Sequence, residues 1–330
     1  MTRIDDYPQV ASQRRQPTGV GRVLRGLLLF CCGFLLFFTA ALTAVRLLGL
    51  DDGTYLALPM AGFPYAVAAT IVLTLVVLAA SGRLLLVLAI ALVVTQLFQV
   101  VPRFIPHNTT ASSVRLRVAA ANTDVGKADP QTIMALVRSE QIDVLSLEEF
   151  TAAGVQALDR AGIGKLLPYH ELHPEIDSSI YSRYPLVLSG LLKAATKWQQ
   201  PTAQIMVGGR TVTIVAVHTY YPPGDPQRWA QDLQALGGAA KTAGKDTVFL
   251  GDFNATLDHA TMRNLLADGL IDSHAELGRG WAPTWPSVLP VFQLDHVLHG
   301  SGLTAVRAGE QTIPGSDHRA VFAELALNQR

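Results

Sequence analysis

The sequence predicts an α+β domain of about 220 residues that follows a membrane anchor of three helices. Three observations lead to this fold class. Long apolar blocks fill most of the first 101 residues. From residue 114 onward, apolar and polar residues alternate as they do in strands. Predicted strands and helices then follow one another without a regular βαβ repeat, which favours a layered α+β arrangement.

The charge of the chain divides at the same point. Residues 1–103 hold eight basic and four acidic side chains, and residues 104–330 hold eighteen and twenty-two. The net charge of zero is therefore the sum of +4 and −4. With 49% hydrophobic residues, the chain is not intrinsically disordered. Cys31 and Cys32, the two cysteines, are adjacent, so there is no disulfide framework and no thiolate zinc site.

The anchor is predicted from length and hydropathy. A hydrocarbon core of about 30 Å requires roughly 20 apolar residues in a helix. We expect a basic cytoplasmic tail over residues 1–22 and a membrane anchor over residues 23–102. The expected transmembrane helices lie at about 26–45, 57–80 and 84–101. A cleaved signal peptide is the alternative for the first block, but that block is too long and two further blocks follow it.

The orientation of the anchor follows from the basic residues beside its helices. Five arginines precede the centre of the first apolar block: Arg3, Arg14, Arg15, Arg22 and Arg25. Arg83 lies in the second turn, whereas Arg46 in the first loop is offset by Asp51 and Asp52. We therefore place the tail and the second turn in the cytoplasm. Three spans then predict a multi-pass protein of the cytoplasmic membrane whose C-terminal domain is extracytoplasmic.

After a linker at residues 103–113, the remaining chain, residues 114–330, is expected to form one domain. A strand pattern ends at Asn122, and Asp129-Pro130 begins a helix that reaches about residue 141. Two strands flank Gly208-Gly209 as a hairpin. The other expected elements are strands at 143–147, 247–250, 293–298 and 320–327 and helices at 226–236 and 261–266.

Polar residues that bind metals or transfer protons recur where these strands end. Strand ends of one sheet present side chains to a shared cleft, so the recurrence predicts a functional site. One such residue is weak evidence, but six groups in one domain exceed what solubility requires. The candidates are Asn122, Glu148, Glu149, His218, Asp252, Asn254, Asp295, His296, Asp317 and His318.

The order of these residues resembles the endonuclease/exonuclease/phosphatase superfamily, the deoxyribonuclease-I-like phosphoesterases. The motifs that carry the resemblance are Asn122, Leu147-Glu148-Glu149, Tyr181-Ser182-Arg183-Tyr184-Pro185, His218, Gly251-Asp252-Phe253-Asn254, Leu294-Asp295-His296 and Ser316-Asp317-His318. The resemblance covers about residues 114–328 and implies a four-layer α/β/β/α sandwich. Together with the preceding anchor, it resembles the membrane-anchored bacterial branch of that superfamily.

The resemblance implies a metal-dependent hydrolase that cleaves a phosphodiester by metal-assisted attack of water. It implies Mg²⁺ or Mn²⁺ as the cofactor and Asn122, Glu149 and Asp317 as the residues that bind it. Oxygen donors of this kind suit a hard divalent cation. Such a cation stabilises the negative charge that develops on the phosphate oxygens.

Five catalytic residues are implied in the same way. Asp252 would align or deprotonate the attacking water, and Asn254 would donate to the scissile phosphate. His318 would contact the phosphate or the water, and Asp295 would fix its tautomer. His218 would stabilise the phosphate oxygens or protonate the leaving group. We expect Asp252 and Asn254 to share one face of a strand whose other face buries Phe253.

Several positions stay open. Glu148 stands where the family has a neutral amide, and we expect it to face solvent, since neighbours on a strand point to opposite sides. Asp124 is either a further metal ligand or a turn residue. Trp281 and Trp285 either stack on a substrate or cover the sheet edge. We expect surface or structural roles for Ser182, Arg183, His170, His173, His259, His274, His296 and His299.

The substrate is undecided between a nucleic acid and a lipid or small phosphodiester of the phospholipid or inositol-phosphate type. Proteins that bind nucleic acids usually carry a basic patch, and this domain has none in its sequence. The expected partners are the lipid bilayer and the phosphodiester, with no obligate protein partner evident. A membrane scaffold that binds a phosphorylated ligand without turnover is the alternative from another functional class.

Overall fold

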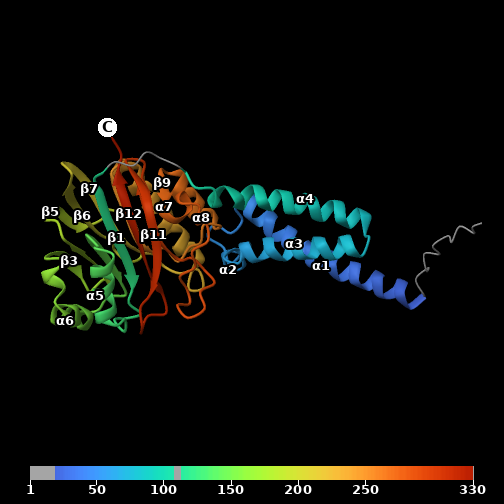
Figure 1. The fold of residues 1–330 in the computed structure, drawn as a ribbon, viewed down its shortest axis with the longest axis horizontal. Helices are drawn as coiled ribbons and strands as arrows, with labels where there is room; N and C mark the ends of the chain where they lie inside the picture. Colours follow the sequence, from blue (N-terminus) through green and yellow to red (C-terminus); the bar gives the residue numbers. More distant parts are fainter. Residues whose placement is uncertain (1–18, 108–112, 330) are drawn as a thin grey trace, which may run out of the picture.

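The computed structural model describes residues 19–107 and 113–329. It shows a bundle of long helices at one end and a domain of two packed sheets at the other (Figure 1). Most of the predicted basic tail, with Arg3, Arg14 and Arg15, lies outside the described residues, as do residues 108–112 of the predicted linker.

The first sheet has the strand order β11-β12-β1-β2-β4-β3, and the second has the order β5-β6-β7-β8-β10-β9. The strands of the first sheet are β1 (Arg115–Asn122), β2 (Val144–Glu148), β3 (Tyr169–His173), β4 (Ser178–Ser182), β11 (Leu303–Thr312) and β12 (Arg319–Leu327). Those of the second are β5 (Leu186–Leu191), β6 (Pro201–Val207), β7 (Arg210–His218), β8 (Thr247–Asp252), β9 (Leu270–Asp272) and β10 (Asp295–Gly300). At the centre of each sheet two strands run parallel, β1 beside β2 and β7 beside β8.

The two sheets pack face to face, and helices cover their outer faces. Buried aliphatic side chains such as Val118 and Leu250 fill the space between the sheets. Helices α5 (Pro130–Ser139) and α6 (Ala152–Ala161) lie against the first sheet. Helices α7 (Pro226–Ala243) and α8 (Ala260–Ala267) lie against the second. The two-sheet α+β sandwich predicted from the sequence is therefore confirmed.

Local signals in the sequence account for much of this arrangement. The Asp129 carboxylate accepts the backbone N–H of Thr132 at 2.9 Å and caps α5. Gly208 and Gly209 have φ values of 56° and 78°, which the tight turn between β6 and β7 requires. Helix α7 runs past the predicted end at residue 236 to Ala243. The buried inner face of the helix outweighs the low helix propensity of Gly237 and Gly238.

Three apolar helices form the bundle: α1 (Gly19–Leu48), α3 (Phe63–Ala79) and α4 (Arg83–Val100). Helix α1 and the segment Arg83–Phe104 are long and apolar enough to cross a membrane. The second predicted span is interrupted: α2 (Ala57–Met60) is separate from α3, which has 17 residues. Gly62 lies at this break and Pro64 in the first turn of α3, and both residue types disfavour a continuous helix across the break. The prediction of three spans is thus corrected to two helices of spanning length among the described residues.

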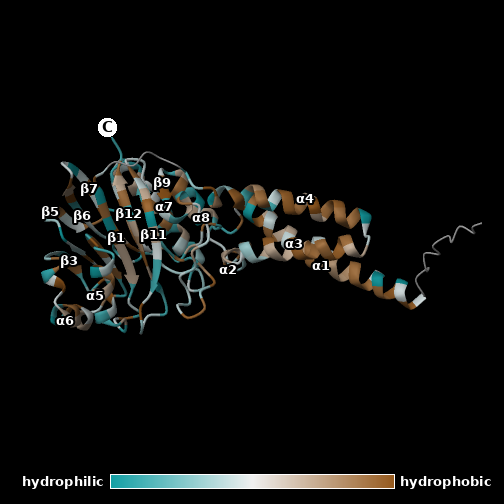
Figure 2. Cartoon of the chain, in the orientation of Figure 1, coloured by the Kyte–Doolittle hydropathy of each residue, from teal (hydrophilic) through white to brown (hydrophobic). Residues whose placement is uncertain are grey.

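The helices of the bundle consist mostly of hydrophobic residues (Figure 2). Phe30 and Phe98 are 71% and 79% exposed, and only 17% of the apolar window of each long helix is buried. The core helix of a soluble protein would bury this surface. Such a surface suits a lipid environment.

Buried polar contacts attach the bundle to the sheet domain. Arg46 at the end of α1 and Arg103 in the short 3₁₀ helix η1 (Val101–Phe104) both pair with Asp258, at 3.1 and 3.0 Å. The three side chains are 8%, 11% and 1% exposed. The backbone N–H of Ala260 also donates to Asp51 at 2.8 Å. Arg103, which the sequence analysis assigns to the linker, therefore belongs to this junction.

We expect Asp258→Asn to weaken the junction. The substitution leaves two buried guanidinium groups without a carboxylate, and breaking a buried ion pair costs about 3–5 kcal/mol. Chemical unfolding of the full chain in detergent measures this loss. Lys241→Ala is the matched control, because the Lys241–Asp268 pair is exposed at 62% and 25% and such pairs contribute about 0–1 kcal/mol. Equal losses in the two variants would contradict the prediction.

Candidate active site

The ends of four central strands meet at one edge of the sandwich. Asn122 ends β1 opposite Glu148 of β2 in the parallel register. His218 ends β7 opposite Asp252 of β8. Asp295 begins the antiparallel strand β10 and also pairs with Asp252. The strand pairing therefore gathers the residues that the sequence analysis singled out.

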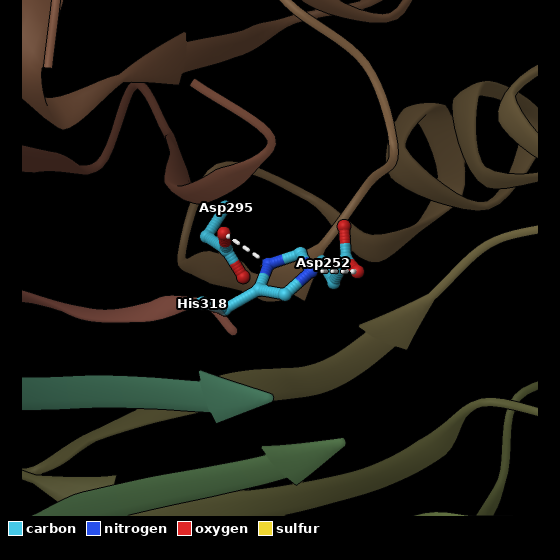
Figure 3. A group of neighbouring side chains, drawn as sticks. All are labelled: Asp252, Asp295 and His318. Carbon is cyan, nitrogen blue, oxygen red and sulfur yellow. Dashed lines mark hydrogen bonds and ion pairs between the residues drawn. The ribbon is translucent and has the colours of Figure 1, made fainter. Parts of the chain in front are cut away.

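His318 lies between two carboxylates (Figure 3). Its Nδ1 is 2.8 Å from Asp295 Oδ2, and its Nε2 is 3.8 Å from Asp252 Oδ2. Thr284 Oγ1 also donates to Asp295 Oδ2, at 2.5 Å, and holds that carboxylate in place. Burial would lower the pKa of His318, but the two carboxylates raise it to about 10. The imidazole is therefore cationic at neutral pH, with Nε2 directed at Asp252.

His218 forms a second pair of the same kind. Its Nδ1 is 3.0 Å from Asp177 Oδ1, and its Nε2 is 4.0 Å from Asp252 Oδ2. The ring stacks on Trp198 with the centroids 4.6 Å apart. Burial would lower the pKa of His218, but Asp177, Asp252 and Glu149 raise it to about 9. Asp177 was missed by the sequence analysis, because an aspartate in a polar turn has no distinguishing pattern.

Asn122 connects two carboxylates. Its Nδ2 donates to Glu149 Oε1 and to Asp252 Oδ2, both at 3.2 Å. The backbone N–H of Val125 donates to the other oxygen of Glu149 at 3.1 Å. Asp317 is more exposed, at 52%, and accepts a hydrogen bond from Trp285 Nε1 at 3.0 Å.

The chemistry of these carboxylates suits a hard cation. Glu149, Asp252 and Asp317 line one cavity and offer oxygen atoms, the donors that Mg²⁺ and Mn²⁺ prefer. Asp252, Asp295 and His318 also form a buried group in which one donor atom from each lies within 4.8 Å of the others. In that group Nδ1 of His318 is already hydrogen-bonded to Asp295. We therefore interpret these two residues as an imidazole–carboxylate pair and not as metal ligands.

Asn254 lies beside Asp252, although not on a strand as predicted. Strand β8 ends at Asp252, and Asn254 has a left-handed φ of 47°. Its backbone N–H donates to Asp252 Oδ1 at 2.8 Å, and its side chain donates to the carbonyl of Thr219 at 3.1 Å. Phe253 between them is fully buried in the core, as expected. The loop thus holds both polar side chains at the cavity while Phe253 packs against the helices.

Glu148 does not face solvent, and that expectation is wrong. Neighbouring residues do point to opposite sides, but the side opposite the helices is the space between the two sheets. Glu148 is completely buried there and accepts a hydrogen bond from Ser146. Burial raises the pKa of Glu148 well above its usual value. Asp124 is a turn residue: its φ is 45°, and its carboxylate pairs with Lys127 at 2.9 Å.

The remaining histidines and tryptophans divide by location. His274, His296 and His299 are buried and pair with Glu310, Asp272 and Glu276, so their roles are structural. Ser182 and Arg183 likewise make structural contacts. Trp285 lines the cavity, whereas Trp281 contacts Tyr65 of α3 with the ring centroids 6.0 Å apart.

The cavity has a volume of about 580 Å³ and unites parts that are distant in the sequence. Asn122 and Asp295 are buried behind its lining and contact residues that form it. The lining also includes residues that the sequence analysis missed. Among these are Ala57, Leu58 and Ala61 of α2 and the residue after it, Trp198, Tyr221, Pro222 and Pro223 of two loops, and His259 beside α8.

The fold and the site define a class of protein. Two packed sheets with paired carboxylates and imidazoles at their common edge are consistent with a deoxyribonuclease-I-like phosphoesterase fold. A family model described as "Endonuclease/Exonuclease/phosphatase family" matches residues 119–318. The chain therefore belongs to this family. Members of the superfamily are hydrolases that act on phosphodiester bonds and typically depend on a divalent metal.

Several solved structures have a similar fold. One is a humanized TDP2 from D. rerio, with 18% identity and a TM-score of 0.55 over 65% of this chain and 99% of that chain. Another is TDP2 from D. rerio complexed with single strand DNA product, with 18% identity and a TM-score of 0.53 over 66% and 100%. A Bacteroides thetaiotaomicron family protein has 15% identity and a TM-score of 0.54 over 67% and 100%. No curated protein matches this chain by sequence.

We expect Asp177→Asn to alter how stability depends on pH. His218 has a pKa of about 9 when folded, against about 6.5 in an unfolded chain. A raised histidine pKa stabilises the protein fully below about pH 6.5, and this stabilisation is lost as the pH rises towards about 9. The free energy of unfolding of both proteins in detergent, measured across this range, should differ most at the acidic end. Parallel curves would contradict the prediction.

Proposed function

We propose that this protein is a membrane-anchored, divalent-metal-dependent phosphoesterase that hydrolyses a phosphodiester by metal-assisted attack of water. The observation that supports this best is the convergence of two imidazole–carboxylate pairs on Asp252. A phosphodiester transition state concentrates negative charge on its oxygens, and two cationic imidazoles beside one carboxylate suit that charge distribution.

Each residue has a proposed role. Asp252 orients the attacking water and accepts its proton as the water oxygen forms the new P–O bond. His318 and His218 donate to the phosphate oxygens, and one of them protonates the ester oxygen as its bond to phosphorus breaks. Asp295 positions His318, and the Asn254 side chain donates to the phosphate.

Asn122, Glu149 and Asp317 are the proposed metal site, with Mg²⁺ or Mn²⁺ as the ion. A bound divalent cation would neutralise the phosphate and polarise it towards attack. Asn122 holds Glu149 and Asp252 close together through its amide, which keeps two carboxylates at one position despite their repulsion. Glu149 itself is held by the backbone of Val125.

The proposed localisation is the cytoplasmic membrane, with the sheet domain extracytoplasmic. Arg25 donates to the carbonyls of Ala80 and Ser81, so the start of α1 and the turn before Arg83 share the bundle end far from the sheet domain (Figure 1). Basic residues concentrate at the cytoplasmic end of such helices. At the other end, Arg46 is neutralised by Asp258. On the same grounds, we propose that the protein belongs to the membrane-anchored bacterial branch of the superfamily.

Mutation of the site should abolish hydrolysis. We expect the full chain with Mg²⁺ or Mn²⁺ to hydrolyse bis(p-nitrophenyl) phosphate and to stop when EDTA removes the metal. Asp252→Ala or His318→Ala should lower kcat by at least about 10²–10⁴-fold, the usual contribution of acid–base groups. His170→Ala is the control, because this exposed histidine does not line the cavity. Binding of a phosphodiester by the wild-type protein without turnover would instead support the non-catalytic scaffold.

The orientation can be tested separately. Fusions of alkaline phosphatase and of a green fluorescent protein to Arg330 report the side of the membrane on which the sheet domain lies. We expect activity of the phosphatase and no fluorescence from a Sec-exported fluorescent protein. Fluorescence without phosphatase activity would place the domain in the cytoplasm and contradict the proposed localisation.

A further inference from the structure

One wall of the active-site cavity belongs to the membrane anchor. Ala57, Leu58 and Ala61, from α2 and the residue after it, line the same cavity as His218, Asp252 and His318. Leu58 is 44% exposed, so part of its side chain is accessible at this wall. A phosphoesterase domain merely tethered to a membrane would not require the anchor at its site.

The contacts around α2 fix this wall in position. Ala57 is fully buried and belongs to the same core as Trp229 and Phe253 of the sheet domain. The carbonyl of Ala57 lies 2.9 Å from His259 Nε2. His259 Nδ1 in turn accepts the backbone N–H of Thr256 at 2.8 Å. The anchor is therefore part of the domain core at this point, and α2 holds a defined place beside the catalytic residues.

The cavity combines charged side chains with an apolar lining. Asp177, Asp252 and Asp295 contact the two imidazoles, and the His218 ring also stacks on Trp198. The side chains of Ala57, Leu58, Ala61, Phe292 and Leu294 are apolar. Among the described residues that line the cavity there is no lysine or arginine. Nucleic-acid binding depends on neutralising several phosphates with such side chains, so this lining disfavours a long polyanion.

Further apolar side chains are exposed in a loop that contacts the bundle. Val288 and Leu289 are 83% and 76% exposed in the loop that follows Trp285. The same loop accepts a hydrogen bond from Tyr65 of α3 at the carbonyl of Val291, at 2.9 Å. Exposed apolar groups that border a bundle with a lipid-compatible surface suit insertion into the adjoining membrane.

We infer that the cavity binds a lipid phosphoester, with the phosphate at His218, Asp252 and His318 and the hydrocarbon chain along the wall formed by Ala57, Leu58 and Ala61. The inference rests on the proposed function and adds its substrate class. The occupant is a membrane lipid because the wall is continuous with the apolar anchor. Helix α2 is thus a specificity determinant and not only a connection between membrane helices.

The test compares two phosphodiesters that share a leaving group and differ in one chain. Full-length protein in phospholipid nanodiscs is assayed with hexadecyl p-nitrophenyl phosphate and ethyl p-nitrophenyl phosphate. We expect kcat/KM for the hexadecyl ester to be at least about tenfold higher, since each buried methylene favours binding. Leu58→Gln should lower this ratio at least about fivefold through a higher KM for the long-chain ester. Ala61→Gln changes the same wall, and it replaces Leu58→Gln in this test if that variant does not fold.

Leu56→Gln is the matched control. Leu56 is two residues away, is 42% exposed and does not line the cavity, so its substitution should leave both activities unchanged. A ratio near one in the wild type would overturn the inference while the proposed function stands. Equal falls in the ratio for Leu56→Gln and Leu58→Gln would also overturn it. Failure to hydrolyse either ester would overturn the proposed function itself and the inference with it.

Discussion

The burial of charge at the edge between two sheets is the constraint on which the rest of the site depends. A buried charge is costly unless an opposite charge or a hydrogen bond compensates it. Asp252 is almost completely buried and has an imidazole on each side. Each imidazole has a further carboxylate at its Nδ1, from Asp177 or Asp295. The alternation of charges both stabilises the buried groups and keeps two imidazoles cationic at neutral pH.

The same constraint operates where the anchor meets the domain. Asp258 is buried and shared by Arg46, near the end of α1, and Arg103, in the 3₁₀ helix η1 that follows α4. An apolar contact could slide, whereas two guanidinium groups on one carboxylate define both distance and orientation. This geometry places α2 against the cavity. Ion pairing therefore determines the chemistry of the site at Asp252, and at Asp258 it helps to set the shape of the cavity.

The sequence predicted the polar residues at strand ends and in the quoted motifs, and it missed residues that reach the cavity through contacts between distant segments. Asn122, His218, Asp252 and Asp295 lie at strand ends, where periodicity and register determine position. Asp177 and Ala57 reach the cavity only through tertiary packing, which leaves no local pattern. Glu148 was misplaced because alternation along a strand predicts opposite sides but not what covers each side. The fold class was predictable for the same reason as the strand ends, since it depends on periodicity.

The place of Ala57 in the domain core has a consequence for how such a protein can evolve. Domain boundaries are usually regarded as points where modules can be exchanged, and here the sequence suggests one near residue 113. Ala57, however, packs with Trp229 and Phe253 across that boundary. Exchange of the anchor for an unrelated one would uncover this apolar core and remove a wall of the cavity. Anchor and domain are therefore expected to be inherited as one unit, with substitutions in one compensated in the other.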